Sequence, residues 1–185
     1  MSHYTYSILL KLFQDFGFAN EELLKDLWIF RYSADFILAR CEMIRKYKIV
    51  NIRTWMIRCP EETLLKHIRR EMENKDILGE YSVTEYLSNK LECSENVAKY
   101  LIRKHPQLQT RSILKLRETI DFLYKHGFTS THICRVSKIL LHSKKTTEKR
   151  IKSLATLGVK SVSLYILTKS QKQYEEHIDN LLKSK

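Results

Sequence analysis

An internal repeat is the feature that most constrains the fold of this 185-residue chain. Residues 17 to 48 match residues 127 to 158 at a single offset of 110 positions. A second offset, of 31 positions, relates the segment beginning at Pro106 to the segment beginning at Ser137. Such a period is typical of a helix–turn–helix unit that buries its apolar side against neighbouring units. The sequence therefore predicts an all-α helical-repeat solenoid with a period of about 31 residues.

Composition agrees with a helical chain. Only four glycines and two prolines are present, too few for the dense turns of β-sandwiches and barrels. The chain reads as one array with four parts. We expect a first repeat group at about 1–74, an acidic connection at about 74–92, a second, basic repeat group at about 93–170 and a C-terminal capping helix at about 170–185.

Helix ends are marked at corresponding positions of the repeats. Ser33, Ser112 and Ser143 precede segments with helical apolar spacing, so their hydroxyls are expected to cap those helices. Gly127 and Gly158 follow the last apolar position, where a left-handed residue commonly ends a helix. The stretch from residue 74 to 84 is expected to be a long connection.

Positive charge is concentrated in one part of the chain. The formal net charge is +12, and residues 101–160 hold 14 basic but only 3 acidic side chains. Cations beside the Ser143 cap oppose the helix dipole, whereas a phosphate backbone would favour them there. We therefore predict a nucleic-acid-binding face made of Arg103, Lys104, Arg111, Arg117, Arg135, Lys138, Lys144, Lys145, Lys149, Arg150 and Lys152.

Some of these residues have a second interpretation. Arg40 and Arg150 recur at one repeat position, and each could contact nucleic acid or bond carbonyls of the preceding repeat. Core or repeat-interface packing is expected, in preference to base stacking, for the aromatic residues Trp28, Phe30, Tyr32 and Trp55.

Signatures of catalysis and cofactors are absent from the sequence. It contains no GxGxxG, GxxxxGK[ST], HExxH or GxSxG pattern. The four cysteines are scattered, so we expect reduced thiols and no metal site. The sequence predicts a non-enzymatic monomer without cofactors, without a membrane span and without a visible transit peptide.

The repeats resemble those of the mitochondrial transcription termination factor (mTERF) family. The resemblance lies in the units from Gly17-Phe18 to Arg40 and from Gly127-Phe128 to Arg150, and in the proline-containing helix end at residues 105–108. Ser137 and Lys48 depart from it, because they stand where the family often has proline and glycine, so we expect the turns there to have a different shape.

The resemblance implies a right-handed superhelix of triplets, each with two α-helices and a 3₁₀ turn, curved around a basic groove. It also implies a mitochondrial protein that binds nucleic acid. We expect double-stranded DNA, with regulation or termination of transcription. The alternatives are ribosomal RNA in mitochondrial ribosome assembly, or a scaffold for a protein partner, for which the apolar C-terminal helix is a candidate contact.

Overall fold

The computed structural model describes residues 3–49 and 52–183. Every regular element in these two ranges is an α-helix or a 3₁₀-helix, which confirms the all-α prediction. The chain divides into two compact units, residues 1–73 and 74–185, and each has its own apolar core.

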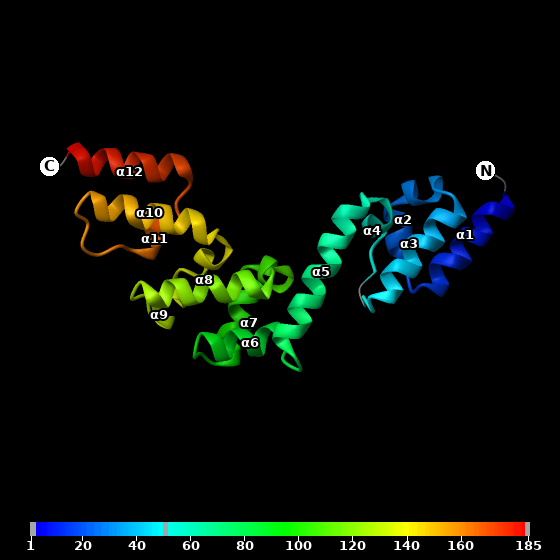
Figure 1. The fold of residues 1–185 in the computed structure, drawn as a ribbon, viewed down its shortest axis with the longest axis horizontal. Helices are drawn as coiled ribbons and strands as arrows, with labels where there is room; N and C mark the ends of the chain where they lie inside the picture. Colours follow the sequence, from blue (N-terminus) through cyan, green and yellow to red (C-terminus); the bar gives the residue numbers. More distant parts are fainter. Residues whose placement is uncertain (1–2, 50–51, 184–185) are drawn as a thin grey trace. The chain divides into compact units, whose positions relative to one another are not determined.

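The first unit (Figure 1) is built from short helices around a core that includes Phe13, Leu23, Ile37, Ile57 and Leu64. Its elements are α1 (His3–Asp15), α2 (Asn20–Lys25), η1 (Leu27–Arg31), α3 (Ala34–Lys46), α4 (Thr54–Arg58) and the larger part of α5 (Glu61–Leu78).

The second unit has a core that includes Leu87, Leu101, Ile120, Leu140 and Leu154. It begins within α5, at Asn74, whose buried side chain accepts a 2.7 Å hydrogen bond from the backbone N–H of Ile113. Its further elements are α6 (Val83–Lys90), α7 (Glu95–Lys104), η2 (Pro106–Thr110), α8 (Ile113–Lys125), α9 (Ser130–Arg135), η3 (Ser137–Leu141), α10 (Lys144–Thr156), α11 (Leu164–Leu167) and α12 (Gln171–Lys183).

Three segments share one order of elements, an α-helix, a five-residue 3₁₀-helix and a thirteen-residue α-helix. They are α2–η1–α3, α7–η2–α8 and α9–η3–α10. Each 3₁₀-helix leads into the serine that begins the following helix. As predicted, Ser33, Ser112 and Ser143 accept hydrogen bonds from the backbone N–H three residues ahead.

The same backbone motif ends several of the helices. Gly127 and Gly158 have φ of 82° and 74°, as predicted for left-handed terminal residues. The N–H of Gly127 bonds the carbonyl of Tyr124, and the next N–H bonds that of Leu123, which is the Schellman pattern. At Lys48 the pattern recurs with φ of 53°, although a lysine occupies the position, so the turn there does not have the different shape that we expected.

Replacing Lys48 with glycine is expected to stabilise the first unit by up to about 1 kcal/mol, because a β-carbon is unfavourable in the left-handed region. Urea unfolding of both proteins measures this difference. Lys46→Gly is the matched control, since Lys46 lies inside α3 and glycine there should destabilise by about 1 kcal/mol. A loss of stability in Lys48→Gly would contradict the prediction.

Two other sequence-based expectations differ from the structure. The stretch 74–84 is not one long connection, because α5 continues to Leu78 and α6 begins at Val83. Trp28 is not a core residue, since it is 60% exposed and lies under the guanidinium of Arg31, 3.8 Å from the ring centroid. Phe30 is buried and Trp55 half-buried, in agreement with core packing.

Candidate nucleic-acid interface

The repeated arginines are structural. Arg40 of α3 is 7% exposed and donates to the carbonyl of Cys59, nineteen residues ahead. Arg150 of α10 is 6% exposed and donates to the carbonyl of Lys169, again nineteen residues ahead, at 2.7 Å. Further bonds of Arg150 reach the carbonyl of Leu167 (2.9 Å) and the side chain of Gln171 (3.1 Å). The two arginines hold the ends of α4 and α11, so they bond carbonyls as expected, but these carbonyls lie further along the chain and not in the preceding repeat. The buried guanidinium of Arg150 is directed at protein acceptors, so Arg150 is not a free contact residue.

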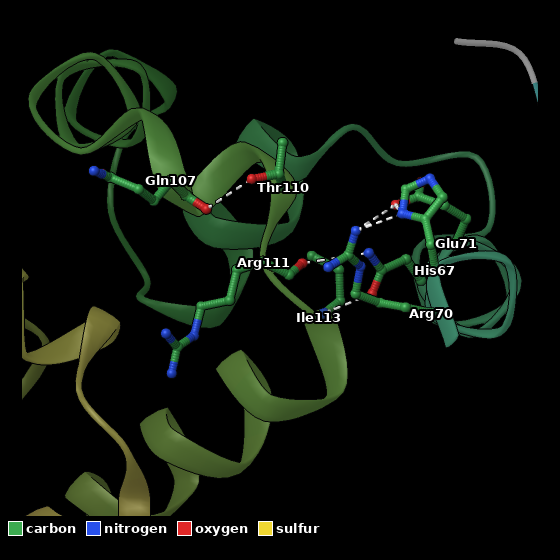
Figure 2. A network of polar contacts seen from close by, with 8 residues as sticks. His67, Arg70, Glu71, Gln107, Thr110, Arg111 and Ile113 are labelled. Atoms are coloured by element: carbon green, nitrogen blue, oxygen red, sulfur yellow. Dashed lines mark hydrogen bonds and ion pairs between the residues drawn. The ribbon is translucent and has the colours of Figure 1, made fainter. Parts of the chain in front are cut away.

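Arg111 has a comparable role within the second unit. Its guanidinium donates to the carbonyls of Leu141 and His142, at 2.9 and 3.0 Å, and so joins the end of η2 to the end of η3. Figure 2 shows the Arg111 side chain extending away from Ile113, the first residue of α8, while Thr110 bonds the carbonyl of Gln107 inside η2. The side chain is half-buried and its donors are directed at carbonyls, so Arg111 is also not a free contact residue.

Replacing Arg150 with alanine is expected to destabilise the second unit by about 3 kcal/mol, because three acceptors lose a charged donor. Lys149→Ala is the matched control, since Lys149 is exposed on the same helix and should change stability by less than about 0.5 kcal/mol. Chemical unfolding of the two variants provides the comparison, and equal values would contradict the structural role.

Two predicted contact residues lie near one histidine, His105, beside the 3₁₀-helices η2 and η3. Lys104 ends α7 and Lys138 lies in η3, and both are exposed. His105 lies near both, with its Nε2 atom 3.1 Å from the hydroxyl of Ser137. Burial lowers the pKa of His105, and the charges of Lys104 and Lys138 lower it further.

A second histidine, His142, lies in the same region of positive charge. Burial lowers the pKa of His142, and the charges of Arg150, Lys138 and Arg111 add to that effect. Within the described residues, no carboxylate is ion-paired with Lys104 or Lys138. The η2–η3 region therefore carries positive charge that the protein itself leaves uncompensated.

The lowered pKa of His142 makes stability depend on pH. An unfolded chain restores the ordinary pKa of about 6.5, so on acidification it takes up a proton before the folded protein does. The free energy of unfolding should then fall as the pH drops below about 6.5 and stay level above it. Unfolding of wild type and His142→Asn at pH 7.5 and 5.5 tests this. The variant should show the smaller fall, and an equal fall would contradict the assignment.

Helix α10 presents a lysine stripe. At 3.6 residues per turn, Lys145, Lys149 and Lys152 fall on the side opposite the buried Thr147, Arg150 and Leu154. All three lysines are exposed, and Lys152 forms an ion pair with Glu148 at 2.8 Å. Lysines 145 and 149 are therefore the residues of this stripe that are free to meet an anion.

Lys144 is placed differently. It lines an open hollow between α8 and α10 together with Glu118, Asp121 and Glu148. These are the three acidic residues of the 101–160 segment, so the charge of Lys144 is partly balanced.

The other predicted residues are exposed but dispersed. Arg117 is close enough to Tyr86 to influence its pKa, which burial raises and the charges of Lys90 and Arg117 lower. Arg103 is exposed near the end of α7. Arg135 lines a groove of about 630 Å³ with His126, His132 and Lys160.

Sequence reasoning missed the histidines. His105 directly precedes Pro106, where η2 begins, and His142 follows the end of η3 and directly precedes Ser143. Their position beside residues that mark the repeats was the available signal. Histidines 126 and 132 gave no such signal, because only the folded chain brings them into the lining of one groove.

The described residues also lack a metal-binding cluster and a membrane-spanning helix. Among the described residues, no group of three or more His, Cys, Asp or Glu side chains could hold a metal ion. Over the same residues, none of the helices has the length and apolar character needed to cross a bilayer.

Comparison with known proteins supplies a relative. Over 168 residues the chain is 36% identical to the Drosophila melanogaster protein named "Transcription termination factor, mitochondrial". The aligned region covers 90% of this chain and 41% of that protein, so the chain spans about two fifths of the relative's length. No protein-family profile matches the chain.

Proposed function

Because the chain belongs to the mitochondrial transcription termination factor (mTERF) family, we propose that it is a non-enzymatic helical-repeat protein that binds double-stranded DNA in mitochondria and regulates or terminates transcription. The observation that carries the proposal is the positive charge around η2 and η3, where Lys104 and Lys138 are exposed and form no ion pair with a carboxylate of the described residues. Phosphate groups are the ligands that such a surface favours.

The repeated elements support a superhelical arrangement of this surface. Helices η2 and η3 begin at Pro106 and Ser137, 31 residues apart, and the arginine bonds of Arg40 and Arg150 span the same nineteen residues. Stacked triplets would place successive 3₁₀-helices along one edge of a right-handed array. Exposed cations on that edge would then follow a nucleic-acid backbone.

DNA is favoured over ribosomal RNA by the relative's name, which refers to transcription termination. Most of the affinity should come from phosphate neutralisation and release of counterions, with an observed binding constant that falls steeply with salt. The contact residues that we propose are Arg103, Lys104, Arg117, Arg135, Lys138, Lys145 and Lys149, with Lys144 and the ion-paired Lys152 at the margin.

Replacing Lys104 and Lys138 together with glutamate is expected to weaken binding to duplex DNA about tenfold or more, because two phosphate contacts become repulsive. The slope of log K against log salt should become shallower by about 1.8. Fluorescence anisotropy with labelled duplex DNA at several salt concentrations measures both quantities.

The control is the pair Lys172→Glu and Lys183→Glu on α12, which changes the net charge by the same amount at exposed positions. It should leave affinity within about twofold. Equal losses would show that only net charge matters and would reject the η2–η3 surface. Tighter binding of RNA than of duplex DNA at matched salt would replace the DNA proposal, and no binding to either would favour a protein scaffold.

A further inference from the structure

Two cysteines far apart in the sequence meet in the second unit. Cys93 lies between α6 and α7, Cys134 lies near the end of α9, and each thiol influences the pKa of the other. Both are half-buried, and both line an open groove of about 370 Å³. The two thiols therefore share one groove, where a small solute can reach them.

The backbone of Cys93 is held firmly. Its N–H bonds the carbonyl of Ser88 at 3.0 Å, and its carbonyl accepts a 2.6 Å bond from the hydroxyl of the same serine. The preceding Glu92 has φ of 48°, so Cys93 follows the left-handed residue that ends α6. The thiol is thus presented from a fixed turn and not from a flexible loop.

Cys134 is anchored by its helix. Helix α9 begins with a capping box between Thr129 and His132, and the buried Ile133 attaches it to the core. A disulfide between these cysteines would therefore join two anchored elements of the same unit.

We propose that Cys93 and Cys134 form a reversible redox site that a hydroperoxide converts into an intramolecular disulfide, which then links α9 to the turn between α6 and α7. With hydrogen peroxide, the thiolate of one cysteine attacks the peroxide oxygen and forms a sulfenic acid, with release of water. The second thiol displaces the sulfenic oxygen as a second water. The two sulfurs lose two electrons, the peroxide gains them, and a thiol reductant reverses the bond.

Burial slows this reaction at neutral pH, because it raises the pKa of both thiols. It raises the pKa of Cys93, and it raises the pKa of Cys134 to about 11, where the neighbouring Cys93 adds to the effect. Glu92, Tyr100 and Arg135 are the other ionisable groups of the groove. Because the thiolate is the reactive form, oxidation should be slow at pH 7 and should accelerate about tenfold per pH unit up to pH 9.

The test uses the full, reduced 185-residue chain treated with hydrogen peroxide, alkylated and mapped by mass spectrometry after proteolysis. We expect two of the four thiols to become inaccessible to the alkylating agent and one cross-linked peptide pair to contain Cys93 and Cys134. The oxidised protein should melt about 5 °C or more above the reduced protein, because the bond closes a long loop.

The variants Cys93→Ser and Cys134→Ser should lose the cross-link and the shift in melting temperature, whereas Cys59→Ser should keep both, since Cys59 is a half-buried thiol of the first unit. Unfolding of the reduced variants checks that they fold. Four alkylated thiols after peroxide, a cross-link that uses Cys41 or Cys59, or covalent dimers would overturn the proposal. None of these readouts uses nucleic acid, so they are independent of the proposed DNA binding.

Discussion

The bond from a buried arginine to the end of a helix further along the chain is the interaction on which the repeats depend. A helix leaves its last four carbonyls without partners, and α4 and α11 have only five and four residues. Such helices consist almost entirely of unsatisfied ends, so they cannot be buried unless donors come from elsewhere. A guanidinium supplies five donors in a rigid plane, and this explains why Arg150 can serve two carbonyls and an amide at once.

Local signals made much of the fold predictable. A serine before a helix and a glycine after it act on backbone groups within a few residues, so Ser143 and Gly158 could be interpreted without tertiary information. All matched residues of segments 17–48 and 127–158 share the offset of 110 positions, and this extended the interpretation to segments far apart in the sequence. Lys48 shows the limit of the approach, because the turn keeps its geometry although the residue that favours it is missing.

The candidate site was less predictable because adjacent residues of one type or charge have different surroundings. Lys149 and Arg150 are neighbours in sequence, but one faces solvent and the other is buried under α11 and α12. Lys144 and Lys145 differ because only the first lies beside the carboxylates of α8. The exposure of Trp28 and the proximity of Cys93 and Cys134 were unpredictable for the same reason. Both depend on which helices pack together, and the periodicity of the sequence does not determine that.

The structural and the proposed functional roles of the basic residues are connected. Arginine remains charged even when buried. Every arginine that bonds carbonyls in the core therefore also places a fixed positive charge beneath the surface. The pKa of His142 shows this, because after burial the largest influence on it is the buried Arg150, followed by Lys138 and Arg111. In residues 101–160, the three carboxylates gather in the hollow beside α8 and α10 and leave this charge unbalanced at η2 and η3. An anion bound there would gain from charges that are already ordered by folding, and it would lose little side-chain entropy. The η2–η3 surface therefore follows from the way the repeats are held together.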